Sequence, residues 1–157
     1  MKIKQVAIGK TEEEYIRKGI EEYETRIQHY ITYESILVPA IRSTAQMTAS
    51  MVKIKEAEKM VKYVNPSDFV VLLDERGVEM RSVEFANFLG TKFNTGLKSM
   101  VFIIGGPFGV DETIRKRANF TFSLSKLTFS HQMVRLFFTE QLYRALTILK
   151  NESYHHE

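Results

Sequence analysis

The chain has 157 residues, of which 44% are hydrophobic and 26% are charged, and its formal net charge is +3. Cysteine is absent, which excludes disulfides and thiolate metal sites, and the mild positive charge permits an anionic partner without requiring one. The longest apolar runs are strand-sized and the N-terminus lacks the apolar core of a secretion signal, so we expect one soluble, cytoplasmic domain over residues 1–157 with no membrane partner.

Strands and helices alternate in the N-terminal half. Residues 2–8 alternate polar and apolar side chains, as a strand with one buried face does. Thr11 and Glu14 have the spacing of a capping box, which predicts that a helix begins near Glu12. The predicted elements of this half are strands at 2–8 and 32–38, a loop at 39–50, and helices from 12 and over 51–64, the second ending before Asn65-Pro66.

The C-terminal half continues this alternation. Residues 69–73 form an unbroken apolar run, which is typical of a buried strand, and a turn is predicted at 74–77. The other predicted elements are helices over 82–94 and 132–150, a short helix with Asp111 as N-cap, and strands over 99–104 and 120–124. Because strand and helix alternate throughout, the sequence predicts an α/β fold with a mainly parallel sheet covered by helices on both faces.

The last predicted helix carries apolar side chains around most of its circumference. They include Met133, Leu136, Phe137, Leu142 and Ile148, which is more than one face of a sheet can cover. The helix is therefore either buried deeply in the core or covered by a second copy of the chain across a twofold interface.

A glycine-rich turn, Gly105-Gly106-Pro107-Phe108-Gly109, follows the strand at 99–104. A loop at this place in an α/β sheet has main-chain groups free to face a ligand. The turn is not the G-x-G-x-x-G dinucleotide fingerprint, and Pro107 removes an N–H donor, so a diphosphate cradle is disfavoured. It is either a purely structural turn or one that lets a phosphate-free ligand approach the backbone.

Residues 123–132 lead into the last helix. The segment is too irregular for a strand, and one interpretation is an ordinary loop capped by Ser130. Ser123 and Lys126 also match the S-x-x-K pattern of serine acyl-enzymes. The companion motifs of those enzymes are missing and the pattern arises easily by chance, so a hydrolase is disfavoured.

The histidines are His29, His131, His155 and His156. They are too scattered and too poor in neighbouring carboxylates for a metal site, so we predict no metal. His131 is expected to orient the loop by hydrogen bonding at the start of the last helix. The terminal Tyr154-His155-His156, taken alone, has the composition of a frayed chain end.

Taken together, four segments resemble one family. They are the strand that leads into Gly-Gly-Pro-x-Gly, the Leu-Ser-x-x-Thr-Phe-x-His-Gln loop, the Glu-x-x-Tyr-Arg-Ala helix and the terminal Tyr-His-His. The family is that of the bacterial SPOUT-class methyltransferases that act on N3 of a pseudouridine in large-subunit (23S) ribosomal RNA, and the likeness covers essentially the full length. It implies a C-terminal trefoil knot, S-adenosylmethionine as the methyl donor, a homodimer through the C-terminal helix, and ribosomal RNA in assembled ribosomes as the partner.

The resemblance also implies which residues form the site. Those that match the family's S-adenosylmethionine contacts are Leu73, Gly105, Leu124, Ser125, Lys126, Leu127, Thr128 and Phe129. Those that match positions of RNA binding or methyl transfer, and are our candidate catalytic residues, are Arg144, Tyr154 and His155. One departure is Ser130, where many relatives have proline, and we expect it to weaken cofactor affinity somewhat without loss of activity.

Two other functions stay open from the sequence. A SPOUT methyltransferase that acts on another RNA, such as tRNA, would have similar cofactor loops, and only the terminal Tyr-His-His and the small size argue against it. The second alternative is a non-catalytic module that binds ribosomes or senses nucleotides with a vestigial pocket. Transfer of a labelled methyl group to ribosomes separates these functions.

Overall fold

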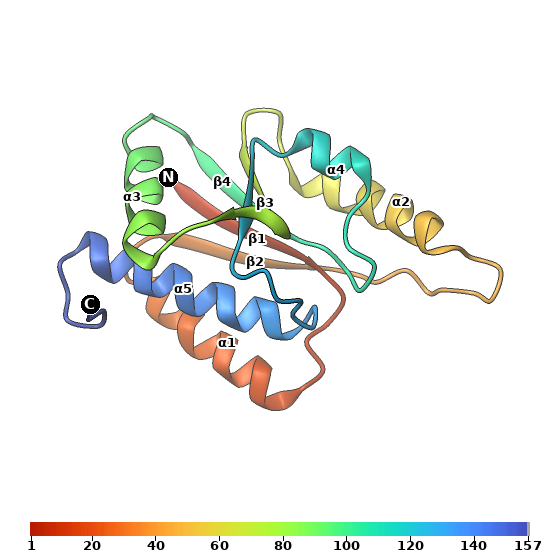
Figure 1. Cartoon of the computed structure of the whole chain (residues 1–157), viewed down its shortest axis with the longest axis horizontal. Helices are drawn as coiled ribbons and strands as arrows, with labels where there is room; N and C mark the ends of the chain where they lie inside the picture. The colour runs from red at the N-terminus through yellow and green to blue at the C-terminus, as the bar shows by residue number, and fades with distance from the viewer. Residues whose placement is uncertain (157) are drawn as a thin grey trace.

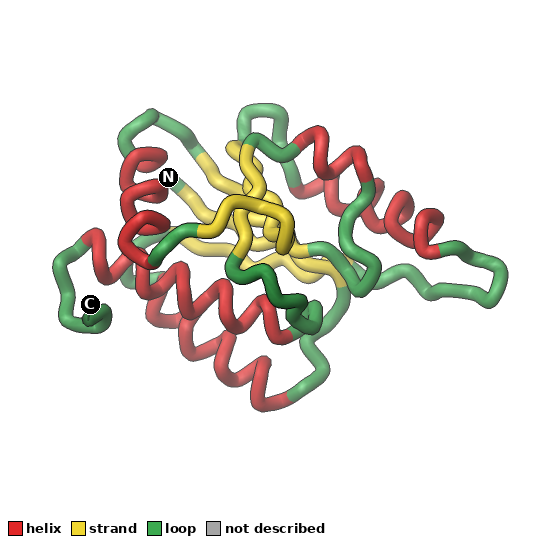
Figure 2. The backbone as a smooth tube through the Cα atoms, in the orientation of Figure 1, coloured by secondary structure: helices red, strands yellow, loops and turns green. Residues whose placement is uncertain are grey.

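Five strands form one parallel sheet in the computed structural model, which describes residues 1–156 (Figure 1, Figure 2). The strands are β1 (Lys2–Ile8), β2 (Thr32–Val38), β3 (Phe69–Glu79), β4 (Ser99–Ile104) and β5 (Phe120–Ser123), in the spatial order β2-β1-β4-β3-β5. Every neighbouring pair is parallel, so the carboxyl ends of all five strands lie at one edge of the sheet. The predicted α/β class is confirmed.

Helices cover both faces of the sheet. One face carries α1 (Glu14–Ile27), α3 (Ser82–Phe93) and α5 (Met133–Leu149), and the other carries α2 (Ala49–Met60), the 3₁₀ turn η1 (Val61–Tyr63) and α4 (Glu112–Arg117) (Figure 1). Each layer has its own apolar core, and all six residues of the central strand β4 are buried between the two layers. No helix in residues 1–156 is long and apolar enough to cross a membrane.

The start of α1 differs from the prediction. The helix begins at Glu14 and has no side-chain cap, so the predicted capping box does not form. The Thr11 hydroxyl instead accepts a hydrogen bond from Arg135 of α5, at 3.0 Å. The free main-chain N–H groups of Glu12 and Glu13 donate to the side-chain oxygen of Gln132. Tertiary contacts with α5 therefore replace the local cap that the sequence suggests.

Helix α2 begins two residues earlier than predicted. Its N-cap is Thr48, whose hydroxyl accepts a hydrogen bond from the Met51 N–H at 3.2 Å. The predicted loop over 39–50 is shorter for this reason. The regular helix ends at Met60, and one 3₁₀ turn completes the predicted segment before Asn65-Pro66.

The predicted turn at 74–77 is wrong, because these residues are part of β3. The strand runs to Glu79 and pairs with β5 on both sides of a register shift between Leu73 and Val78. Gly77 passes so close to β5 that a Cβ atom there would lie 2.7 Å from the carbonyl oxygen of Thr121. The irregular stretch leaves Asp74 at the carboxyl edge of the sheet.

Helix α5 packs on the sheet between α1 and α3 but is not fully enclosed. Phe138, Leu142 and Ala145 on its inner face are at most 1% exposed. Phe137 points the other way and is 45% exposed. The chain on its own therefore leaves part of the apolar circumference of this helix uncovered.

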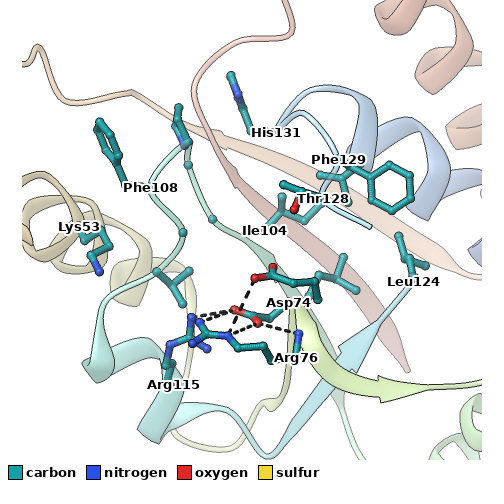
Figure 3. A pocket seen from close by; sticks show the side chains of 18 of the residues that line it. Lys53, Asp74, Arg76, Ile104, Phe108, Arg115, Leu124, Thr128, Phe129 and His131 are labelled. Carbon is teal, nitrogen blue, oxygen red and sulfur yellow. Dashed lines mark hydrogen bonds and ion pairs between the residues drawn. The ribbon is translucent and has the colours of Figure 1, made fainter. Parts of the chain in front are cut away.

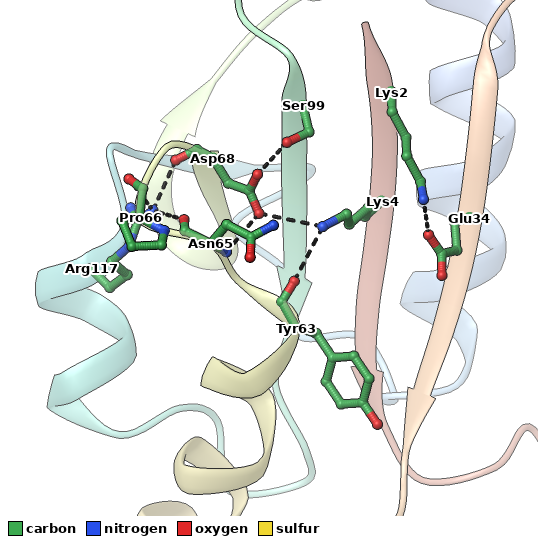
Figure 4. A network of polar contacts seen from close by, with 9 residues as sticks. All are labelled: Lys2, Lys4, Glu34, Tyr63, Asn65, Pro66, Asp68, Ser99 and Arg117. Atoms are coloured by element: carbon green, nitrogen blue, oxygen red, sulfur yellow. Dashed lines mark hydrogen bonds and ion pairs between the residues drawn. The ribbon is translucent and has the colours of Figure 1, made fainter.

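A buried polar network ties the amino-terminal ends of the strands together (Figure 4). Asp68 is 4% exposed; its carboxylate accepts hydrogen bonds from the Ser99 hydroxyl, from the Asn65 N–H and from the Lys4 ammonium. Burial raises the pKa of Asp68, but these three partners together outweigh burial and hold the pKa below its usual value. The carboxylate therefore stays ionised and stabilises the fold.

We expect Asp68→Asn to lower the free energy of unfolding by about 1–3 kcal/mol at pH 7, because it removes the charge from buried hydrogen bonds. Because the pKa of Asp68 is lower in the folded state than in the unfolded state, the carboxylate contributes its full stabilisation only at a pH above the unfolded-state pKa. The difference in free energy of unfolding between Asp68→Asn and wild type should therefore shrink as the pH falls below about 4. Chemical denaturation at pH 7 and pH 3.5 measures this. Glu34→Gln, which breaks the exposed pair with Lys2 in the same region, is the control and should cost less than about 1 kcal/mol. An equal loss of unfolding free energy in the two variants would contradict the stabilising role of the Asp68 carboxylate.

Candidate active site

Three loops at the carboxyl edge of the sheet enclose a cavity of about 840 Å³. They are the irregular part of β3 after Leu73, the glycine turn after β4, and the loop between β5 and α5 (Figure 3). The volume is within the range of pockets that hold cofactor-sized ligands. The cavity is thus at the place where open α/β sheets bind ligands.

The glycine turn is compact because it folds back on itself. The Gly109 N–H donates to the Gly106 carbonyl oxygen at 2.9 Å, and Gly109 has a φ of +80°, which favours glycine. A Cβ atom at Gly105 would lie 2.8 Å from the carbonyl carbon of Gly109, and one at Gly106 would lie 2.8 Å from the buried carboxylate of Glu56. The turn therefore needs glycine at Gly105 and favours it at Gly109, whereas a side chain at Gly106 would displace the end of the Glu56 side chain.

The loop between β5 and α5 is held by its own serines. The Ser125 hydroxyl accepts from the Leu127 N–H at 3.0 Å, and the Ser130 hydroxyl accepts from the Met133 N–H at 3.1 Å, as predicted for a capping residue. Ser123 is buried and donates to the Ser125 carbonyl oxygen, whereas the Lys126 side chain is 84% exposed and lies 3.9 Å from Glu79. Ser123 and Lys126 do not form a catalytic pair, so the hydrolase interpretation has no support from the geometry.

Seven of the eight residues predicted to contact the cofactor line the cavity. They are Leu73, Gly105, Leu124, Ser125, Leu127, Thr128 and Phe129. The exception is Lys126, which does not line the cavity and whose exposed side chain lies near Glu79. Phe129 also packs against Phe137 of α5, with ring centroids 5.0 Å apart, which fixes the end of the loop.

Asp74 is a residue of the cavity that sequence reasoning missed. Its carboxylate accepts from Arg115 at 2.7 Å and from Arg76 at 3.1 Å (Figure 3). Burial raises the pKa of Asp74, but the two arginines outweigh it and keep the pKa below its usual value. This ionised network joins β3 to α4 and fixes one wall of the cavity. The sequence does place an aspartate directly after a buried apolar run, which is a common position for a site residue. The prediction assigned that aspartate to a turn and so did not consider it as part of the site.

His131 lies on another side of the cavity mouth. It was predicted to orient the loop through a hydrogen bond, yet it makes none with residues 1–156. Burial and the charge of Arg135 lower the pKa of His131, so its imidazole is neutral at pH 7. Among the described residues, no three His, Asp or Glu side chains are grouped so as to hold a metal ion.

The candidate catalytic residues gather at the opposite end of α5. Arg144 donates to Glu140 at 2.5 Å, its guanidinium lies 4.7 Å from the ring centroid of Tyr154, and it approaches Nδ1 of His155 at 3.5 Å. Tyr154 also donates to Glu140, at 3.0 Å, and its hydroxyl lies 3.3 Å from that of Tyr23. Glu140, which sequence reasoning did not single out, is the centre of this cluster.

The chain end is docked, so the frayed-tail interpretation is wrong for the described residues. Asn151 adopts a φ of 56°, and the Glu152 N–H donates to the Thr147 carbonyl oxygen, which turns the chain back at the end of α5. The Tyr30 hydroxyl donates a hydrogen bond to the Glu152 carboxylate at 2.5 Å.

The tail cluster lies far from the cavity within one copy. Arg144 follows the cavity residue Val134 by ten positions, or about 15 Å along the helix. Within one copy the tail cluster and the cavity are therefore separate.

Comparisons with known proteins, by family model, by sequence and by structure, all point to methyltransferases. A family model described as "Predicted SPOUT methyltransferase" matches residues 1–155. The chain is 52% identical to the ribosomal RNA large subunit methyltransferase H of Christiangramia forsetii, over 99% of both chains, and 47% identical to that of Parabacteroides distasonis, over 100% of both. Two solved structures share the fold: a probable methylase family protein from Haemophilus influenzae (TM-score 0.53, 11% identity, 99% of this chain and 70% of that one) and a probable methyltransferase from Bordetella pertussis (TM-score 0.53, 12% identity, 92% and 95%).

Proposed function

Because the chain belongs to the SPOUT methyltransferase family, we propose that it transfers a methyl group from S-adenosylmethionine to N3 of a pseudouridine in large-subunit ribosomal RNA. The observation that carries this proposal is the cavity, where seven residues that match the family's cofactor contacts meet although they come from three separate loops. Relatives that match the whole chain carry the name of a large-subunit ribosomal RNA methyltransferase. The knot implied by the resemblance stays a prediction.

The cavity fits a donor of this kind. Gly105, Gly106 and Gly109 of its glycine turn line the cavity without side chains, and main-chain N–H and C=O groups suit adenine and ribose. Leu73, Leu124 and Phe129 supply apolar walls for the adenosyl group. When bound, the donor supplies an activated methyl group on a sulfonium. The protein's contribution is to hold the acceptor in line with that group and to exclude water.

Arg144 is proposed to stabilise the anion that forms when the imide nitrogen of the acceptor loses its proton. Tyr154 is proposed to bind RNA rather than to accept the proton. Burial and the hydrogen bonds with Tyr23 and Glu140 hold the pKa of Tyr154 well above its usual value, so its hydroxyl stays protonated. The nearby His155, whose buried Nε2 atom has no hydrogen-bond partner in the described chain, is proposed to bind RNA or to relay the proton.

The separation of cavity and tail is the reason to propose a homodimer. The uncovered face of α5 carries Phe137, Gln141 and Arg144 in a row at helical spacing. If two copies of α5 cross antiparallel about an axis between Phe137 and Gln141, Arg144 of one copy comes opposite Val134 of the other, which lines the cavity. Each site would then combine the cavity of one copy with the tail of its partner.

The acceptor is identified by incubating the protein with labelled S-adenosylmethionine and one of three substrates. These are intact ribosomes from a strain that lacks its own pseudouridine methyltransferase, naked 23S ribosomal RNA, and tRNA. We expect label on one pseudouridine of the large subunit, with ribosomes far better than naked RNA because the chain is only mildly basic. Label on tRNA would replace the proposed acceptor, and no label with any RNA would refute methyl transfer.

A further inference from the structure

We propose that Phe108 is a stacking platform for a nucleobase of the RNA, next to the methyl-transfer site. The inference rests on the proposed function and adds an RNA contact to it. Phe108 occupies the tip of the glycine turn at the cavity mouth and is 53% exposed (Figure 3). It belongs to neither apolar core and makes no ring–ring contact within the described residues. An exposed aromatic ring at the mouth of the site is placed where a base of a bound RNA could stack on it.

The turn holds Phe108 in place. Gly106 and Gly109 are bonded across it, Pro107 restricts the backbone before the phenylalanine, and Glu56 fills the space behind Gly106. The preceding strand β4 is paired on both sides. A side chain with two rotatable bonds on a fixed backbone loses little conformational entropy when a partner stacks on it.

The helical layer on this side of the sheet carries a net positive charge. Residues 39–65 and 111–119, which include α2 and α4 on this side of the sheet, carry eight Lys or Arg against four Asp or Glu. Their net charge of +4 exceeds the +3 of the whole chain, so the remaining residues sum to −1. The cavity wall itself carries both signs, with Lys53, Arg76 and Arg115 beside Asp74, Glu75, Asp111 and Glu112. The positive excess therefore belongs to the helical layer as a whole, which suits an RNA backbone, while the exposed ring of Phe108 suits a base.

Two other occupants fit less well. The adenine of the donor would lie inside the cavity against Gly105 and the loop of residues 124–129, whereas Phe108 is on the outer tip of the turn. A second copy of the chain would cover the exposed face of α5 near Phe137, in the other helical layer. An RNA base is the partner that remains for this position.

The test compares Phe108→Leu, Phe108→Tyr and Phe108→Trp with wild type, using labelled S-adenosylmethionine and ribosomes. Phe108→Leu keeps an apolar side chain but loses the ring, so KM for ribosomes should rise about 5- to 100-fold while kcat and donor affinity change less than about twofold. Tyr and Trp should restore KM to within about threefold of wild type. Tyr63→Leu, an exposed aromatic residue at the far end of the same layer, should have no effect.

Three outcomes would overturn the inference. If Phe108→Leu has the wild-type KM, the ring is not used for stacking. If donor affinity falls while KM rises, the ring contacts the donor instead. If the variant changes the molecular mass in solution, the residue is at a contact between copies. Failure of the wild-type protein to methylate any RNA would refute the proposed function, and this result is distinct from all three.

Discussion

Arg144→Ala should reduce kcat for methyl transfer to ribosomes by about 10²- to 10³-fold, the usual loss when one group that stabilises a developing anion is removed. Its affinity for S-adenosylmethionine should stay within about twofold of wild type. The reason for this separation is geometric, since Arg144 lies in the tail cluster with Glu140 and Tyr154 and does not line the cavity. Single-turnover kinetics and calorimetry with the donor measure the two quantities.

Arg26→Ala is the matched control for that variant. Arg26 also pairs with a glutamate four residues earlier on its helix and lies over the rings of Tyr23 and Tyr143 beside the tail cluster, but it makes no ion pair or hydrogen bond with Glu140, Tyr154 or His155. We expect it to leave kcat within about threefold of wild type. A comparable fall in donor affinity and kcat for Arg144→Ala, or a large fall in its thermal stability, would mean that Arg144 has a structural role.

Gly105→Ala should weaken the binding of S-adenosylmethionine by about 10- to 100-fold. The added Cβ atom would lie 2.8 Å from the Gly109 carbonyl carbon and 2.9 Å from the Val110 side chain, so the turn has to open. Forcing a methyl group into such a space costs about 1–3 kcal/mol, and each 1.4 kcal/mol is a factor of ten in affinity. The bulkier Gly105→Val should abolish measurable binding.

Gly90→Ala is the control for the glycine substitution. Gly90 lies within α3, and an added Cβ there would meet only the flexible end of the Leu149 side chain, at 3.0 Å. Donor affinity should be unchanged, as isothermal calorimetry can show. Unchanged affinity in Gly105→Ala as well would remove the glycine turn from the donor site.

Local rules predicted those elements whose signals are local. Asp111 caps α4 as expected, through a hydrogen bond from the Thr113 N–H, and the alternation of strands and helices gave the parallel sheet. The rules failed where distant segments meet. Thr11 has the sequence of a cap, but the buried Arg135 binds its hydroxyl instead, and Gly77 supports a close strand crossing rather than a turn. The contacts with Arg135 and with β5 cannot be predicted from residues 11–14 or 74–77 alone.

The same limit applies to the site. The glycine turn and the loop into α5 could be identified from sequence because each follows a strand and has an unusual composition. The pairing of Asp74 with Arg115 could not, since 41 residues separate them. Nor could the role of Glu140, which is recognisable only once the chain end folds back and brings Tyr154 to it. The distance between tail and cavity within one copy also depends on the three-dimensional course of α5.

The most direct test of the account is the activity of dimers that combine two defective chains. Dimers with Gly105→Val in one chain and Arg144→Ala in the other are isolated through two different affinity tags and assayed on ribosomes. If each site joins the cavity of one copy to the tail of the other, one of the two sites is intact and about half of the wild-type activity should return. Dimers with both substitutions in one chain and none in the other should then be inactive. The opposite pattern, with activity only in the second kind of dimer, would show that each chain forms its own site and would contradict the account.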